Sequence, residues 1–233
     1  MDELTGAPTS TSGFTPETIP TARLILLPLA VEHAQEMAAV LADPALHTFI
    51  GGEPAAPAAL RARYERLVAG SPDPAESWCN WVIHLRDDGR LAGFVQATVT
   101  GPHGTVSDTA TAGARAVGHR HLDEAAPAVA GPVAEIAWVV GTQWQGRGIA
   151  VEAARGMAVW LGRRGVRTLM AHIHSDHRAS AAVATACGLV PTEVWQDGEV
   201  RWTGPATPTP PPPAPAEGAR VRRGRPRTGG GPG

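Results

Sequence analysis

The sequence predicts a mixed α/β domain in which strands and amphipathic helices share one core. Three observations support this prediction. Short apolar runs of strand length are interleaved with segments whose apolar residues recur at helical spacing. Two Asp-Gly pairs, Asp88-Gly89 and Asp197-Gly198, each lie between two such runs, and Asp-Gly in that setting signals a β-hairpin. At 233 residues, 43% of them hydrophobic, the chain can bury one substantial core.

The first half of the chain is expected to open the sheet and to supply two helices. Residues 1–20 are rich in Thr, Ser and Pro, and we expect a flexible N-terminal segment there. Three elements follow: a strand over 23–29 (RLILLPL), a helix over 31–43 and a second helix over 57–70. The hairpin over 78–99 comes next, with WCNWVIHL and LAGFVQATV as its strands.

The second half is expected to follow a long insertion at 101–132. That segment is rich in Gly, Ala, Thr and Pro and shows no sustained periodicity, so we expect it to be flexible. The elements predicted after it are a strand at 134–140, a helix ending near Arg164, a strand at 167–174, a helix around 178–187 and a hairpin over 191–202. The predicted domain therefore covers 21–203.

The remaining residues, 204–233, are expected to form a disordered tail. A polyproline run comes first and an arginine-rich stretch follows. Within that stretch RRGRPR resembles an AT-hook, a clamp for the minor groove of DNA. Accessory DNA binding is therefore an alternative, although one copy in an arginine-rich tail leads us not to expect nucleic acid as a partner.

Composition excludes several classes of protein. There is no lysine in the chain, and P-loop proteins, Schiff-base enzymes and protein kinases all need one. Cys79 and Cys187 form no CxxC pair, which argues against a zinc ribbon or a disulfide framework. No apolar run is long enough to cross a bilayer, and the N-terminus lacks the features of a secretion signal. We therefore expect a cytoplasmic protein with no membrane partner.

The most specific motif is QGRGIA, residues 145–150, between a predicted strand and a predicted helix. Glycine weakens strands and helices, so two glycines here need an explanation. A helix N-terminus offers free backbone N–H groups and the positive end of a dipole, which together bind anions. Arg147 adds a positive charge, and Glu152 in the first helical turn is expected to interact favourably with the dipole. The motif is therefore either a phosphate-binding loop or simply a tight turn.

This motif resembles the acyl-CoA pyrophosphate loop, Gln-x-x-Gly-x-Ala, of the GCN5-related N-acetyltransferase (GNAT) superfamily. TARLILLPL, GRLAGFVQATV and AEIAWVV resemble the first, third and fourth strands of that family, and SDHRASAAVATACGL resembles the segment after the fifth strand. The resemblance spans 21–203 apart from the insertion, and is nearest to the RimJ/RimL-like branch. It implies a GNAT fold, in which a central mixed, largely antiparallel sheet of about six to seven strands is flanked by helices and splayed between strands 4 and 5.

The resemblance also implies acetyl-CoA as the acyl donor, bound between the splayed strands, with no metal. The diphosphate would lie on the backbone amides of Gln145, Gly146, Arg147, Gly148, Ile149 and Ala150. The pantetheine arm would pair with the strand IAWVV, and an amide near Val139 or Val140 would hydrogen-bond the thioester carbonyl as an oxyanion-type donor. His177, which stands where the family usually has asparagine, and Ser180 would complete the acetyl-CoA contacts.

Acetyl transfer to an amine needs a base for the amine proton and a proton source for the departing thiolate. The resemblance implies Glu135 as the base, acting directly or through water, with a solvated strand-end charge as the alternative. Many relatives use a tyrosine as the acid, but this chain has Ala184 at the matching position. Ser180 is therefore the candidate proton donor, and His177 or water are alternatives.

The predicted function is an N-acetyltransferase that moves an acetyl group to a primary amine, on a small molecule or a protein N-terminus, by direct attack. A non-catalytic acyl-CoA-binding module is the alternative, because the tyrosine is missing. A metal site is a further alternative, since His172 and His174 share a strand face with Asp176 and His177 close behind. No other ligand stands at a familiar spacing, so we expect no metal. We expect a monomer or a homodimer.

Overall fold

The computed structural model describes residues 14–101 and 131–206. Residues 1–13, nearly all of the predicted insertion and most of the predicted tail, including RRGRPR, lie outside the described residues. The elements, in chain order, are β1 (Ile19–Pro20), β2 (Leu24–Pro28), η1 (Val31–His33), α1 (Ala34–Val40), α2 (Pro44–Ile50), α3 (Pro57–Ala69), β3 (Glu76–Leu85), β4 (Leu91–Thr100), β5 (Val133–Val140), η2 (Thr142–Trp144), α4 (Ile149–Arg163), β6 (Thr168–His174), α5 (Arg178–Ala186), β7 (Val190–Gln196) and β8 (Glu199–Pro205).

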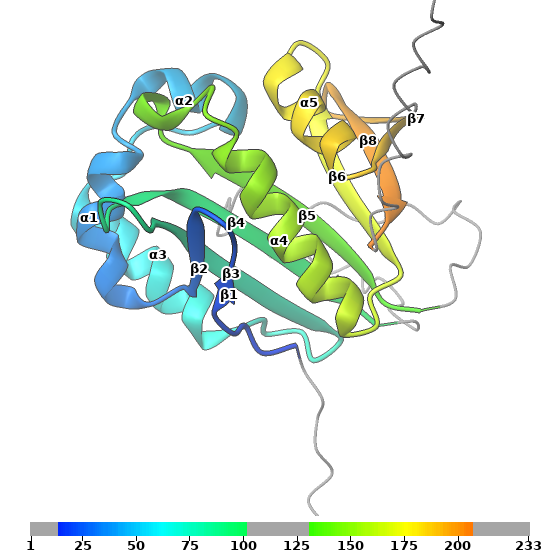
Figure 1. Ribbon diagram of the computed structural model, residues 1–233, viewed down its shortest axis with the longest axis horizontal. Helices are drawn as coiled ribbons and strands as arrows, with labels where there is room; N and C mark the ends of the chain where they lie inside the picture. The colour runs from blue at the N-terminus through cyan, green and yellow to red at the C-terminus, as the bar shows by residue number, and fades with distance from the viewer. Residues whose placement is uncertain (1–13, 102–130, 207–233) are drawn as a thin grey trace, which may run out of the picture.

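The strands form one mixed sheet in the order β1-β2-β3-β4-β5-β6-β8-β7. Every neighbouring pair is antiparallel except β5 with β6. Helix α4 crosses one face of the sheet, and α1 and α3 lie on the other (Figure 1). The predicted fold class, a largely antiparallel mixed sheet flanked by helices, is confirmed.

Two short elements differ from the prediction. The sheet has eight strands rather than six to seven, because the two-residue strand β1 pairs with β2. Helix α2 was not predicted at all. It begins at Pro44, which suits the first turn of a helix, and the Asp43 side chain caps it by accepting a hydrogen bond from the Ala45 N–H at 2.9 Å.

The described end of the N-terminal segment is part of the folded domain. The indole Nε1 of Trp81, a fully buried residue, donates a hydrogen bond to the carbonyl oxygen of Glu17 at 2.8 Å. The carboxylate of Glu17 pairs with Arg164 just beyond α4. Residues 14–20, which we grouped with the flexible segment 1–20, therefore belong to the domain.

Small residues let α4 lie close to the sheet. Ala153 and Ala154 are fully buried on its inner face. A Cβ at Gly156 would lie 2.9 Å from the Thr21 side chain, so only glycine fits there without movement of that side chain. Close packing of this helix fixes its first turn against the residues that precede β2.

Strands β5 and β6 are hydrogen-bonded only at their beginnings. The paired residues run from Val133 with Thr168 to Glu135 with Met170, although β5 continues to Val140 and β6 to His174. Beyond Glu135 the two strands part, while β5 stays paired with β4 and β6 with β8 (Figure 1). The predicted splay is present, and it lies between β5 and β6 of this sheet.

Candidate functional site

The glycine-rich loop joins the end of β5 to the beginning of α4, at the open end of the splayed strands (Figure 1). Gly146 has φ 73° and Gly148 has φ 74°. Both angles lie in the left-handed region, which glycine adopts readily and residues with a Cβ rarely do. The two glycines are thus required by the backbone conformation of the turn.

This turn leaves a run of backbone amides free. Within residues 14–101 and 131–206, no backbone hydrogen bond is donated by the amides of residues 146–150. The first amides of α4 have no partner inside the helix, and residues 145–148 are exposed. Free amides at the positive end of a 15-residue helix are the donors that a phosphate group needs.

Gln145 has a different place from the one we predicted for it. Its backbone N–H donates to the carbonyl oxygen of Thr142 at 3.2 Å. Its side-chain Nε2 donates to the carbonyl oxygen of Val140 at 3.0 Å. Gln145 therefore stabilises the turn through these two hydrogen bonds, and the free amides begin at Gly146.

The two predicted donors at the end of β5 can be distinguished by the direction of their N–H groups. The Gly141 N–H donates to the carbonyl oxygen of Ala92, in line with β4, at 2.9 Å. Successive N–H groups of a strand point to opposite sides. The Val139 N–H therefore points toward β4, and the Val140 N–H points toward the opening between β5 and β6.

Glu135 lies at the point where β5 and β6 part, and its side chain meets His172 of β6. Its Oε1 is 3.0 Å from His172 Nδ1. The His172 side chain is only 3% exposed and that of Glu135 17%. A carboxylate can only accept, so Nδ1 is the donor in this hydrogen bond. From the sequence, His172 was considered only as an alternative metal ligand, and its pairing with Glu135 was not predicted.

Arg201 lies beside His172. The two residues are direct partners in the antiparallel pairing of β6 and β8, which places both on one face. Arg201 is buried, and neither its Nε nor His172 Nε2 has a hydrogen-bond partner among the residues that the structure describes. The face of the sheet at the splay therefore carries a half-buried carboxylate beside a buried imidazole and a buried guanidinium.

Ser180 and His177 lie across the opening, at the start of α5. Ser180 is half-buried in the first turn of that helix. His177 is its N-terminal flanking residue, and its ring stacks on Phe49 of α2, with ring centroids 4.1 Å apart and planes inclined by 3°. Burial lowers the pKa of His177 below its ordinary value, and the nearby His174 lowers it further. The ring of His177, a predicted acetyl-CoA contact, thus packs against α2, a helix that was not predicted from the sequence.

The alternative of a metal site, and the question of a membrane span, can both be examined in the described residues. No group of three or more His, Cys, Asp or Glu side chains able to hold a metal occurs among them. None of their helices combines the length and apolar character that a bilayer span requires.

Ala184, at the position of the missing tyrosine, is fully buried in α5, so this position faces the core rather than the opening.

The family model described as the acetyltransferase (GNAT) domain matches residues 23–190, more than half of the chain. This match identifies the protein as an acyltransferase enzyme. The chain belongs to the GNAT family, and it is an acetyl-CoA-dependent N-acetyltransferase. None of the curated proteins matches the sequence significantly.

Solved structures share the fold. A GNAT-family acetyltransferase from Bacillus anthracis is 13% identical, with a TM-score of 0.57, over 82% of this chain and 99% of that one. RimL, a ribosomal L7/L12 alpha-N-protein acetyltransferase solved with coenzyme A, is 15% identical, with a TM-score of 0.58, over 81% and 98%. An acetyltransferase from Agrobacterium tumefaciens is 20% identical, with a TM-score of 0.52, over 82% and 95%. The predicted family is confirmed, and RimL is among its structural neighbours.

Proposed function

We propose that this enzyme binds acetyl-CoA in the opening between β5 and β6 and transfers its acetyl group directly to a primary amine, with Glu135 as the base. The run of free amides over residues 146–150, beside the splayed strands, is the observation that carries this proposal. These donors match the diphosphate of coenzyme A in charge and in hydrogen-bonding character. The unpaired side of β5 offers a strand edge along which the pantetheine amides can pair.

In this reaction the neutral amine attacks the thioester carbonyl carbon and forms the new C–N bond. The Val140 N–H faces the opening, and we assign it the hydrogen bond to the carbonyl oxygen, where negative charge develops as the tetrahedral intermediate forms. The C–S bond then breaks, and coenzyme A leaves as a thiolate that takes up a proton. The amine gives up one proton to the base.

Glu135 is suited to receive that proton, directly or through a water molecule. It lies where the strands part, and the hydrogen bond with His172 holds its carboxylate in place. We assign the protonation of the thiolate to Ser180, which lies on the α5 side of the opening. His177 is a weaker candidate, because its lowered pKa leaves the ring without its second proton near neutral pH.

The acceptor is a primary amine, on a protein N-terminus or on a small molecule. RimL acts on the α-amino group of ribosomal protein L7/L12, as its name states, and a protein N-terminus is the first acceptor to test. A non-catalytic acyl-CoA-binding module remains the other candidate. Its main support was the absence of a tyrosine at Ala184, and this support is reduced because position 184 faces the core.

We further propose a cytoplasmic enzyme, monomeric or homodimeric, that uses no metal and has neither a membrane nor a nucleic acid as a partner. Both cysteines, Cys79 and Cys187, are free and buried, which fits a reducing compartment. Burial raises the pKa of the Cys79 thiol to about 12 and that of Cys187 to about 11. Neither thiol is therefore reactive near neutral pH, and transfer through a cysteine is not part of the proposed mechanism.

The test is release of free thiol from acetyl-CoA across a panel of N-terminal peptides and small amines. We expect turnover with at least one acceptor, and loss of that turnover in Glu135→Gln and Ser180→Ala while calorimetry still detects acetyl-CoA binding. Binding by the wild-type protein without turnover on any amine would favour the non-catalytic module. Absence of binding at millimolar acetyl-CoA would contradict the proposed site.

A further inference from the structure

We propose that Arg23 and Glu152 form a positioning pair that fixes the diphosphate-binding loop in its anion-binding conformation. The two residues lie far apart in the sequence, on the segment leading into β2 and in the first turn of α4. This inference rests on the proposed function of the loop, and it assigns to Arg23 a role in binding acetyl-CoA that is exerted through the backbone at Arg147.

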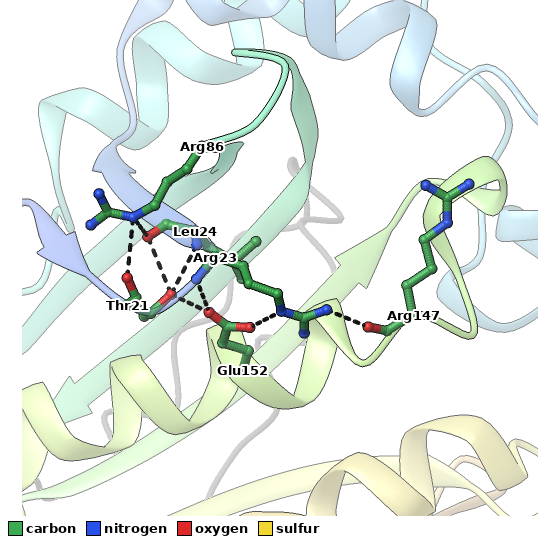
Figure 2. Close-up of polar contacts among 6 residues, drawn as sticks. All are labelled: Thr21, Arg23, Leu24, Arg86, Arg147 and Glu152. Atoms are coloured by element: carbon green, nitrogen blue, oxygen red, sulfur yellow. Dashed lines mark hydrogen bonds and ion pairs between the residues drawn. The ribbon is translucent and has the colours of Figure 1, made fainter.

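Glu152 ties the first turn of α4 to the segment before β2 (Figure 2). Its Oε1 accepts hydrogen bonds from Thr21 Oγ1 at 2.6 Å and from the Arg23 backbone N–H at 2.7 Å. Its Oε2 accepts from Arg23 Nε, also at 2.7 Å. Burial alone would raise the pKa of Glu152, but these hydrogen bonds and the Arg23 charge outweigh it, so the pKa lies below its usual value. Glu152 therefore stays ionised at neutral pH.

The guanidinium of Arg23 continues from Glu152 to the loop. Its Nη1 donates to the carbonyl oxygen of Arg147 at 2.9 Å, while the Arg147 side chain extends away from the cluster (Figure 2). Its Nη2 lies 3.4 Å from the place where a Cβ at position 148 would be. One guanidinium thus contacts both the helix turn and the peptide group that joins Arg147 to Gly148.

This contact determines which way that peptide group faces. The peptide is trans and planar, so its carbonyl oxygen and the Gly148 N–H point in opposite directions. Because Arg23 holds the carbonyl, the Gly148 N–H is directed away from Arg23. A glycine on each side of Arg147 would otherwise allow this peptide to rotate and present its carbonyl oxygen to the anion. A carbonyl oxygen there would repel a phosphate.

The pair also offsets an electrostatic cost. A carboxylate in the first turn interacts favourably with the helix dipole, as predicted from the sequence, but it repels an anion bound at the same helix end. The Arg23 guanidinium compensates the Glu152 charge. The segment that carries Arg23 is itself held, since Arg86 Nε donates to the carbonyl oxygens of Thr21 and Leu24, each at 3.1 Å (Figure 2).

A simpler interpretation is that Arg23 only adds positive charge near the loop. Its side chain is 56% exposed, so solvent screens that charge. Lysine retains the charge but cannot reach Glu152 and the Arg147 carbonyl with the planar fork of arginine. The substitution Arg23→Lys therefore separates positioning from charge.

The experiment measures steady-state kinetics with acetyl-CoA and with S-acetyl-N-acetylcysteamine, a thioester that has no diphosphate. For Arg23→Lys we expect the KM for acetyl-CoA to rise about tenfold, the scale of one charge-assisted hydrogen bond. We expect kcat at saturating acetyl-CoA, and the rate with the short thioester, to stay within about twofold of wild type. The matched control is Arg164→Lys, in an ion pair with Glu17 near the other end of α4, and it should leave both substrates unaffected.

Equilibrium binding provides a second measurement that does not depend on turnover. The ratio of the dissociation constants for pantetheine and coenzyme A should fall about tenfold in Arg23→Lys and also in Glu152→Gln. A wild-type KM for acetyl-CoA, or an unchanged ratio, in Arg23→Lys would overturn the positioning role. If the wild-type protein itself does not prefer coenzyme A over pantetheine, the loop is no diphosphate site and the proposed function fails instead. An Arg23→Lys protein that does not fold leaves Glu152→Gln to decide by the same ratio.

Discussion

Glu135 of β5 and His172 of β6 meet at 3.0 Å across the point where their strands separate. Met170 is the last residue of β6 paired with β5, opposite Glu135, and His172 follows on the same face two residues later. The side chains thus bridge the two strands just beyond their last backbone pairing. This relationship places a carboxylate at the closed end of the opening and gives it a buried hydrogen-bond partner.

The first prediction concerns Glu135. Glu135→Gln keeps the size and polarity of the side chain but cannot take up a proton, so kcat should fall by about 10²- to 10⁴-fold, the usual contribution of a general base. Coenzyme A binding should remain, because the loop at residues 146–150 is untouched. Amine-dependent thiol release and calorimetry measure the two properties separately. Retention of wild-type kcat would mean that Glu135 is only a strand-end charge.

The second prediction concerns His172. In His172→Phe the ring volume remains but the hydrogen bond to Glu135 is lost, so the carboxylate becomes free to change rotamer. We expect kcat to fall, but by less than in Glu135→Gln, and the double variant to be no worse than Glu135→Gln alone. A thermodynamic cycle on kcat checks this. Additive losses from the two substitutions would show that His172 acts independently of Glu135.

Long periodic segments of the sequence predicted their elements well, and short ones were missed. The helix α4 was predicted from its apolar spacing and the preceding glycines, and it ends within a residue of Arg164. The strand β1 has only two residues, and α2 has seven, with only Leu46 buried. A two-residue strand shows no period, and α2, unlike the equally short α1, is not part of a longer run of apolar residues at helical spacing. Their existence depends on partners elsewhere, such as the neighbouring strand for β1.

The candidate site shows the same division between local and distant information. The left-handed glycines of the loop follow from local backbone chemistry, and the sequence indicated them. Glu152 and Arg23 are separated by 129 positions, and Glu135 and His172 by 37. Such pairs follow from which strands are neighbours and in what register, and neither was known from the residue pattern. His172 stands two residues after Met170, the partner of Glu135. This relation could have indicated the pair, but only if the register of β5 and β6 had been known.

The third prediction uses the pKa of His177. Burial lowers that pKa below 6.5, with His174 adding to the effect, and the Phe49 ring stacks on the imidazole. A histidine whose folded pKa is depressed stabilises the fold above its unfolded pKa, and this contribution is lost as the pH falls through the folded value. As the pH falls below 6.5, the free energy of unfolding of the wild-type protein should therefore decrease more than that of His177→Asn. Denaturant titrations over that range measure the difference.

The companion variant for this prediction is Phe49→Ala. Removing the stacked ring exposes His177 to water, so its pKa should rise toward the ordinary 6.5. An NMR titration of the imidazole protons follows this directly. If the pKa of His177 in Phe49→Ala stays where it is in the wild-type protein, burial by α2 is not what lowers it.

The last prediction separates backbone strain from ligand binding by comparing two glycines. Gly148 at the loop has φ 74° and Gly165 beyond the other end of α4 has φ 93°. Alanine at either place must adopt a left-handed conformation, at a cost of roughly 1–2 kcal/mol. Both Gly148→Ala and Gly165→Ala should therefore lower the free energy of unfolding by similar amounts.

Only Gly148→Ala also places a methyl group against the Arg23 guanidinium, 3.4 Å away, and changes the amides proposed to hold the diphosphate. Its affinity for coenzyme A should fall by about tenfold, whereas Gly165→Ala should bind as the wild type does. Equal coenzyme A affinities in the two variants, at equal losses of stability, would show that the turn at Gly148 is needed for folding alone.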